Sequence, residues 1–196
     1  MSRTATVSRA SRETDIRVTV ELDGSGKCAA RTGIGFFDHM LDAFSRFSLL
    51  DLQVDCKGDL EVDSHHSVED TGILLGKAIR EALGERAGIH RVGSAYMPMD
   101  EALAFAAVDI SGRPYLSFQA DFASPACGQF DTQLAEEFFR AVAVNAGLTV
   151  HLKVLEGRND HHKLEALFKA FGLALREAAA MDPRVTGVPS TKGVLD

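Results

Sequence analysis

Two adjacent histidine pairs stand out in the chain, and each pair is followed by a glutamate at the same distance. The first pair lies in the stretch DSHHSVED (63–70), and the second lies in DHHKLEA (160–166). Imidazole and carboxylate groups without thiolates suit Mn, Fe, Zn or Ni ions, whereas a structural zinc site would usually contain cysteine. The two stretches together offer six candidate metal ligands, which are His65, His66, Glu69, His161, His162 and Glu165.

Both motifs lie at the start of a segment that is expected to be helical. A helix turns about 100° per residue, so the first histidine and the glutamate share one face. The two histidines of a pair point about 100° apart. They are therefore better placed to serve two ions, or to reach the other half of the chain, than to bind one ion together. One such pair could be exposed polar surface, but two copies in register favour metal binding.

The histidine motifs belong to a longer internal repeat with a constant offset, from His65 to His161. Glu69 and Gly76 also meet an identical residue at this offset. Many identities without gaps indicate a tandem duplication of a unit of roughly ninety residues. With a gap of two residues the preceding helices also align, which places Asp38-His39 opposite Glu136-Glu137.

The elements expected around the motifs follow the same repeat. We expect helices at 33–48, 65–86, 131–147 and 161–181, and strands within 16–22, 50–63, 101–122 and 148–157. Helices must cover one face of each sheet, so the halves are expected to pack helix against helix with the sheets outside. The fold class is therefore α+β. The chain 1–196 is expected to be one domain, made of repeats at about 9–90 and about 91–185 and a C-terminal tail at 186–196.

Composition argues against several other classes of protein. The chain has 196 residues, of which 45% are hydrophobic and 25% are charged, as in an ordinary soluble globular protein. The net charge of −7 argues against non-specific nucleic-acid binding, and no apolar run approaches the ~20 residues that span a bilayer. The three cysteines form no C-x-x-C motif, and no secretory signal is visible. These features indicate a cytoplasmic protein that binds neither nucleic acid nor membranes.

Other polar residues could complete a site. His39 lies on the helix before the first motif and could supply another ligand, while His90 and His151 are interpreted as structural. The tail segment STKG (190–193) resembles an anion-binding loop, with a hydroxyl, an ammonium and backbone donors. In an acidic protein this loop indicates a phosphorylated substrate. The candidate contacts are Arg91, Arg113, Lys169, Ser190 and Lys192.

Six segments of the chain carry a family resemblance. They are GFFDHMLDAF, DSHHSVEDTGILLGKAI, MDEALAFAAVDISGRPYL, DTQLAEEFF, NDHHKLEALFKAF and PSTKGVLD. Together they resemble imidazoleglycerol-phosphate dehydratases of histidine biosynthesis, in their monofunctional form, from about Arg9 to the C-terminus. The resemblance implies a tandem duplication of a ribosomal S5 domain 2-like unit, with helices packed between two mixed four-stranded sheets.

The resemblance also implies a reaction. It is the dehydration of D-erythro-imidazole glycerol phosphate to imidazole acetol phosphate, with two Mn²⁺ ions in each active site. If an ion binds a ring nitrogen and favours imidazolate, the ring can expel the neighbouring hydroxyl, and a carboxylate can shuttle the protons. Two ions that bracket one imidazole would explain why the histidine pair occurs once in each half. Subunits would assemble into trimers and then into a homo-oligomer of roughly 24 subunits, with sites at the interfaces.

The same resemblance assigns roles to individual residues. Glu13, in SRETD, matches the acid/base position and would touch the substrate, and the phosphate contacts would be the basic and hydroxyl residues named above. Where the family commonly has a histidine ligand, this chain has Glu137, and a carboxylate coordinates Mn²⁺ well. Catalytic roles are implied for Glu13, His39, His65, Glu69 and Glu165. The metal ligands would be His39, His65, His66, Glu69, Glu137, His161, His162 and Glu165.

Two rival interpretations stand beside this one. A di-metal carboxylate protein of the bundle type would use Glu-x-x-His motifs, but here the order is His-x-x-Glu and strand-rich segments separate the helices. A non-enzymatic protein that assembles through metal ions would explain the ligands, but it would leave Arg91, Arg113 and Lys192 without a role. Binding of a phosphorylated compound would separate this second rival from the enzyme.

Overall fold

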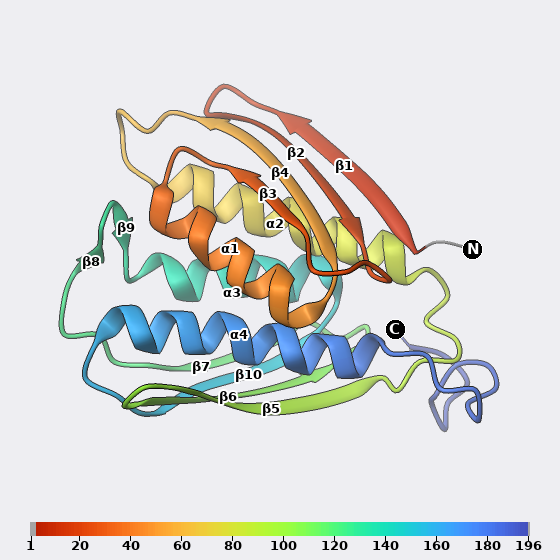
Figure 1. Ribbon diagram of the computed structural model, residues 1–196. Coiled ribbons are helices and arrows are strands. Elements are labelled where there is room, and N and C mark those ends of the chain that lie inside the picture. Colours follow the sequence, from red (N-terminus) through yellow and green to blue (C-terminus); the bar gives the residue numbers. More distant parts are fainter. Residues whose placement is uncertain (1–2, 196) are drawn as a thin grey trace.

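Two four-stranded sheets form the outer layers of the molecule, and four helices lie between them (Figure 1). The computed structural model describes residues 3–195, so Met1, Ser2 and Asp196, the last residue of the expected tail, lie outside the described residues. The first half contains β1 (Thr4–Ala10), β2 (Thr14–Glu21), β3 (Cys28–Arg31), α1 (Gly35–Ser48), β4 (Asp51–Gly58) and α2 (His65–Leu83). The second half contains β5 (Val92–Met99), β6 (Ala102–Asp109), β7 (Tyr115–Gln119), β8 (Ala126–Cys127), β9 (Phe130–Asp131), α3 (Leu134–Ala146), β10 (Thr149–Glu156) and α4 (Asp160–Ala179).

The two large sheets have the same strand order and the same pairing directions. The first runs β1-β2-β4-β3, and the second runs β5-β6-β10-β7. In each sheet the first three strands pair antiparallel, and the last two pair parallel. This topology confirms the expected α+β fold with helices between two mixed sheets, and it matches the internal repeat of the sequence.

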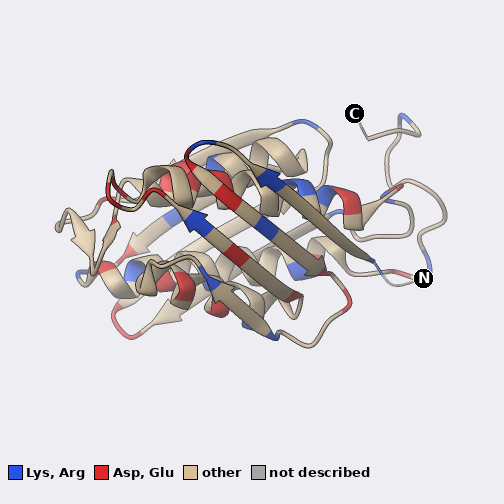
Figure 2. Cartoon of the chain, turned by 90° about the horizontal axis from the view of Figure 1, so that it is seen from above, with Lys and Arg blue, Asp and Glu red and all other residues tan. Residues whose placement is uncertain are grey.

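Side-chain alternation decides which face of each sheet meets the helices. Ile16, Val18 and Val20 of β2 are buried, while Arg17 between them is exposed. The outer face of the first sheet is therefore polar. Figure 2 looks onto this face and shows acidic and basic residues along the strands.

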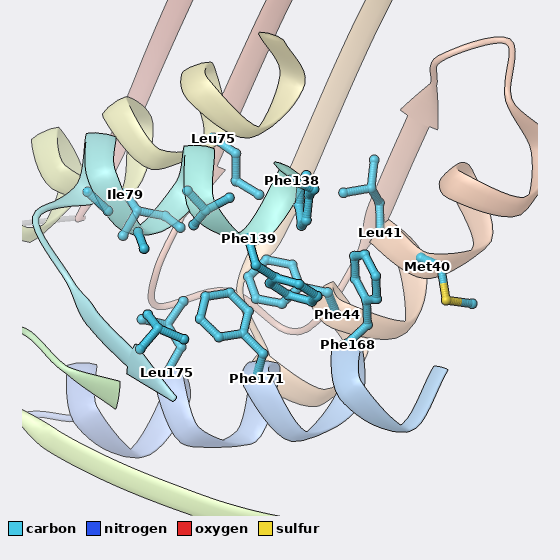
Figure 3. Packing of buried hydrophobic residues seen from close by; sticks show 14 of the residues in the cluster. Met40, Leu41, Phe44, Leu75, Ile79, Phe138, Phe139, Phe168, Phe171 and Leu175 are labelled. Atoms are coloured by element: carbon cyan, nitrogen blue, oxygen red, sulfur yellow. The ribbon is translucent and has the colours of Figure 1, made fainter. Parts of the chain in front are cut away.

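A core of aromatic side chains lies between the helices (Figure 3). Helix α1 packs on α4 and α2 packs on α3, so each contact joins the two halves. Phe44 of α1 stacks on Phe171 of α4 with ring centroids 5.4 Å apart. Phe138 and Phe139 of α3 lie 5.3 and 4.7 Å from Phe168 of α4. All five rings are at most 1% exposed, so the repeats share a single core.

Two glycines of the repeat lie where helices cross. A Cβ atom on Gly76 of α2 would lie 2.7 Å from the carbonyl oxygen of Val142 in α3. A Cβ atom on Gly172 of α4 would lie 2.8 Å from the carbonyl oxygen of Phe44 in α1. The identity of these two positions therefore has a packing cause, because the helices approach too closely to admit a side chain.

The structure differs from the sequence expectations mainly at the edges of the sheets. Strands β1, β3 and β5 are not among the expected strands, and each lies at a sheet edge. Their sequences explain the omission, because β1 is largely polar, β3 has only four residues, and β5 contains Gly93 and Pro98. The region 50–63 contains one strand, β4, and β8 and β9 form a small hairpin ahead of α3, whose first residue is Leu134.

Neither a membrane span nor a disulfide is present among residues 3–195. No helix in this range combines the length and apolarity needed to cross a bilayer. Cys28, Cys56 and Cys127 are all free thiols, and burial raises the pKa of Cys28 to about 12.

Candidate metal centre

One group of potential metal ligands forms where α1 meets α4. His39 of α1 and His161 of α4 lie with their Nε2 atoms 3.3 and 3.1 Å from Oε2 of Glu165. The ligand atoms of these three residues lie within 4.8 Å of one another, and no other group of this kind occurs in the described part of the chain. Glu165 is 7% exposed, so its carboxylate forms the buried base of the group and the two imidazoles form its open side.

Lys169 fixes the second oxygen of the buried carboxylate. Its Nζ lies 2.6 Å from Oε1 of Glu165, and the ammonium also lies over the Phe47 ring and close to the sulfur of Met99. Burial alone would raise the pKa of Glu165, but the hydrogen bond and charge of Lys169 bring that pKa below its ordinary value. The carboxylate therefore stays anionic and keeps Oε2 directed at the histidines.

The quasi-equivalent group in the first half is less complete. On α2, Nε2 of His65 lies 3.4 Å from Oε2 of Glu69, which repeats the spacing of His161 and Glu165. The internal repeat predicts that α3 contributes Glu137, in the role that α1 gives to His39. Instead, Arg140 binds Glu137 at 2.7 Å and Glu136 at 2.6 Å. The structure therefore places Glu137 in an ion pair, outside any group of three ligands.

The second histidine of each pair faces a different direction from the first. His65 and His161 approach the glutamates of their own helices, Glu69 and Glu165. His66 and His162 approach carboxylates outside the helices, Asp59 and Glu101. These separate partners agree with the expectation that the two histidines of a pair point in different directions. The structure thus brings His161 together with Glu165 and His39, while His66 and His162 lie on other sides of their helices.

Each of these outlying histidines has a carboxylate partner that the sequence analysis missed. Nδ1 of His66 lies 3.0 Å from Oδ2 of Asp59, and Nδ1 of His162 lies 2.8 Å from Oε2 of Glu101. These hydrogen bonds raise the pKa of both histidines. The bond to His162 also helps to lower the pKa of Glu101 to about 2. A signal for Glu101 was available, because it occupies the turn before β6 as Glu13 occupies the turn before β2.

Helices α2 and α4 begin at or next to their histidine pairs, and a side chain just ahead of each pair binds the exposed backbone N–H groups. The side chain of Asp63 accepts a hydrogen bond from the backbone N–H of His65 at 2.7 Å. Asn159 does the same for His161 at 2.9 Å, and it also binds the N–H of His162. Asp63 and Asn159 are equivalent positions of the repeat. Asn159 is the N-cap residue of α4, and Asp63 lies one residue before the N-cap of α2, so each half supplies an acceptor for an otherwise unsatisfied helix start.

All of the expected phosphate contacts except Lys169 lie at the end of α4 that is opposite His161. The backbone N–H of Arg91 binds the carbonyl of Ala178 near the end of α4, and the side chain binds Asp109 and the carbonyl of Pro189. At 1.5 Å per residue, His161 and Ala178 are roughly 25 Å apart along the helix axis. Arg91 also fixes the start of the tail that carries Ser190 and Lys192.

Arg113 lies with this distal group rather than with the histidines. Its neighbour Gly112 binds the carbonyl of Gly147, and Tyr115 binds the carbonyl of Leu148, where α3 ends and β10 begins. Of the expected substrate contacts, the structure brings Lys169 to the metal group, and it places Glu13 with its Oε1 4.0 Å from Nε2 of His66.

Comparisons with known proteins agree with this architecture. The family model described as imidazoleglycerol-phosphate dehydratase matches residues 32–175. A protein of that name from Symbiobacterium thermophilum is 62% identical over 98% of this chain and 93% of its own length. Another from Ruminiclostridium cellulolyticum is 58% identical over 98% of this chain and 100% of its own length.

Solved structures give the same result. The chain is similar to a crystal structure of imidazoleglycerol-phosphate dehydratase from Staphylococcus aureus, with a TM-score of 0.83 and 41% identity over 91% of this chain and 99% of that one. It is also similar to the Pyrococcus furiosus enzyme in complex with (S)-C348, with a TM-score of 0.82 and 41% identity over 96% of this chain and 100% of that one. The chain therefore belongs to the imidazoleglycerol-phosphate dehydratase family, whose members are hydro-lyases.

Proposed function

We propose that this chain dehydrates D-erythro-imidazole glycerol phosphate to imidazole acetol phosphate, as a step of L-histidine biosynthesis. The observation that carries the proposal is the convergence of His39, His161 and Glu165 in a chain of this family. The convergence joins two helices from different repeats, and it also leaves two imidazoles open to a substrate.

We further propose that two Mn²⁺ ions serve each active site. The donors fit this ion, because imidazole nitrogen and carboxylate oxygen without thiolate suit it. One set of donors is His39, His161 and Glu165, and the matching set is His65, Glu69 and Glu137, once Glu137 leaves Arg140. His66 and His162 would complete the ligands. When bound, manganese supplies a Lewis acid that polarises the nitrogens of the substrate ring.

The protein's own carboxylates would handle the protons and the charge. Glu13 is half exposed and lies on a turn beside His66, where it is free to reach a substrate carbon and to carry a proton between two positions. Glu165 would remain anionic, because Lys169 pairs with it away from solvent. The two carboxylates would thus have different tasks, one mobile and one fixed.

We propose that each active site is completed by a second copy of the chain. The distal group of Arg91, Arg113, Ser190 and Lys192 lies roughly 25 Å from His161 along α4. A substrate of the size of a glycerol phosphate cannot bridge that distance within one chain. A homo-oligomer built from trimers, of roughly 24 subunits, would bring the distal group of one chain to the histidines of another.

The proposed setting is cytoplasmic. Three free thiols without disulfides suit a reducing compartment. The expected partners are the phosphorylated imidazole substrate and other copies of the chain, and neither nucleic acid nor a membrane.

Turnover of imidazole glycerol phosphate by metal-stripped protein, with and without added Mn²⁺, tests the reaction and the cofactor together. We expect the ketone product only when Mn²⁺ is present. Turnover that is equally fast in the stripped protein would contradict the metal role. Bound Mn²⁺ without any product would contradict the reaction, and it would favour an assembly protein held together by metal.

A further inference from the structure

We infer that Asp59 and Glu101 are positioning residues for the metal centre, each orienting the second histidine of one pair. The inference rests on the proposed metal function, because it concerns how His66 and His162 are presented to an ion. Each carboxylate accepts a hydrogen bond at Nδ1 and so leaves Nε2 as the free ligand atom. Neither residue belongs to the histidine and glutamate motifs.

The contact between Asp59 and His66 is fixed by the carboxylate oxygens and by the backbone of Asp59. Both carboxylate oxygens of Asp59 lie close to Nδ1 of His66, at 3.1 and 3.0 Å, and the Asp59 side chain is 18% exposed. The backbone of Asp59 is also fixed, because its N–H binds the carbonyl of Glu13 and its carbonyl binds the N–H of Val62. The position of the carboxylate is therefore set by the loop and not by the histidine alone.

The second contact is built from a different part of the fold. Oε2 of Glu101 lies 2.8 Å from Nδ1 of His162, while Oε1 accepts hydrogen bonds from the backbone N–H groups of Arg158 and Asn159. One carboxylate thus joins the turn between β5 and β6, the loop that leads into α4, and the histidine. Since Asn159 caps α4 at His161, Glu101 orients the whole start of that helix.

The two halves reach the same arrangement from non-equivalent positions. Asp59 follows β4, whereas Glu101 precedes β6. At the offset that relates the two histidine pairs, Leu155 is the counterpart of Asp59. By sheet topology the counterpart of Glu101 is Glu13, whose carboxylate lies 4.0 Å from Nε2 of His66 and not at Nδ1. The pairing is therefore not a remnant of the duplication. Each half supplies a carboxylate where its own loops allow one, which indicates a requirement at the histidine.

The chemical consequence is the choice of ring tautomer. A histidine that donates Nδ1–H to a carboxylate presents a lone pair on Nε2 and becomes a more basic metal ligand. In this structure those Nε2 atoms face further acidic groups, Glu13 at 4.0 Å from His66 and Asp100 at 3.7 Å from His162. The open side of each ring is thus lined with oxygen donors and suits a divalent cation.

The test is Mn²⁺ binding to the metal-stripped full chain, measured by titration calorimetry and by electron paramagnetic resonance of the free ion. We expect Asp59→Ala and Glu101→Ala to weaken binding by about 10- to 100-fold, with no loss of cooperative unfolding. Asp59→Asn should recover most of the affinity, since the amide oxygen can still accept from Nδ1–H. His66→Ala is the positive control, and Asp55→Ala, on the outer face of the preceding strand β4, is the negative control.

Wild-type affinity and stoichiometry in both alanine variants would overturn the inference, and so would equal losses in Asp59→Asn and Asp59→Ala. If Asp59→Ala fails to fold, the comparison of Glu101→Ala with Glu101→Gln decides the matter, because the inference expects a loss of affinity in the first and its recovery in the second. The readout does not depend on turnover. A chain that binds Mn²⁺ through oriented histidines but forms no ketone would refute the proposed reaction and leave this inference standing.

Discussion

At the scale of single residues, Lys169 has two possible roles, which are to bind the substrate phosphate and to fix Glu165. It was expected to contact the substrate phosphate, and it lies 2.6 Å from the buried Glu165 with only 15% of its side chain exposed. We predict that Lys169→Met weakens Mn²⁺ binding by about tenfold, because Glu165 loses the cation that fixes it. Calorimetric titration checks this. An unchanged Mn²⁺ affinity with a raised KM would assign Lys169 to the phosphate instead.

Glu137 also has two possible partners, Arg140 and a metal ion. Arg140 holds Glu137 and Glu136 in ion pairs on the surface of α3, and a metal ion at Glu137 must displace the guanidinium. We predict that Arg140→Gln raises Mn²⁺ affinity a few-fold, and that Glu137→Ala lowers the number of ions bound per chain. If Glu137→Ala leaves stoichiometry and affinity unchanged, Glu137 is not a ligand.

Asp51 gives a pH-dependent effect far from the histidines. Hydrogen bonds from the backbone N–H groups of Lys27 and Ser25 lower the pKa of Asp51. A carboxyl whose pKa is lower in the folded state than in the unfolded state stabilises the fold fully at pH values above its ordinary pKa of about 4. That stabilisation is lost as the pH falls through the lowered pKa. Asp51→Ala should therefore destabilise the chain by about 1 kcal/mol at pH 7.

Urea unfolding at several pH values measures this effect. The difference between wild type and Asp51→Ala should shrink steadily below about pH 4. Asp55→Ala on the same strand is the control, because its carboxylate contacts the side chains of Gln53 and Arg31 and not a turn. A difference that stays constant from pH 7 to pH 3 would contradict the role of the carboxylate charge.

At the scale of elements, the helix crossings set a strict limit on size. We predict that Gly76→Ala and Gly172→Ala each destabilise the chain by about 1–3 kcal/mol, because the added methyl would overlap a backbone oxygen of the facing helix. Alanine has a better helix propensity than glycine, but this gain is smaller than the expected loss of stability. Chemical unfolding is the measurement. Gly35→Ala is the control, since its Cβ would meet no atom within 4 Å.

The elements also show where sequence reasoning succeeds and fails. The four helices and the buried strands β2, β4, β6 and β10 could be predicted, because their buried side chains recur with a clear period. The strands that were missed, β1, β3 and β5, lie at sheet edges, where fewer side chains are buried and the pattern weakens.

The same contrast holds for the candidate site. His39, His161 and Glu165 could be named from motif and resemblance, and they converge. Asp59 could not, because its role comes from a distance to His66 that only folding creates. Glu101 could have been suspected from its turn, which is equivalent to that of Glu13, but its contact with His162 also appears only in the folded chain. The sequence also could not show whether Glu137 pairs with Arg140 or binds a metal ion, since both interactions use the same carboxylate.

At the scale of the whole molecule, the separation of the two groups of residues leads to a complementation test. His161→Ala damages the end that carries the metal ligands, and Arg113→Ala damages the distal end. Each variant alone should be inactive. When the two are assembled together at random, roughly a quarter of the sites should combine an intact metal end with an intact distal end from different chains.

Turnover of the mixed assembly at saturating substrate and Mn²⁺ measures this directly. Mixing two variants that are damaged at the same end, His161→Ala with His39→Ala, is the control and should restore much less activity. If the His161→Ala and Arg113→Ala mixture also stays inactive, the proposal that two copies share a site is wrong.

The hairpin of β8 and β9 is the clearest difference between the two halves. Residues 32–34 alone join β3 to α1, whereas residues 120–133 join β7 to α3. The carbonyl of Gln129 binds Ser64, next to the first histidine pair, and Phe130 lies 5.7 Å from Phe36, whose ring meets His161 edge-on. Two identical centres produced by a duplication have the same surroundings and therefore the same chemistry. An insertion that contacts both centres from one side gives them different surroundings, so the two centres can take on different chemical roles.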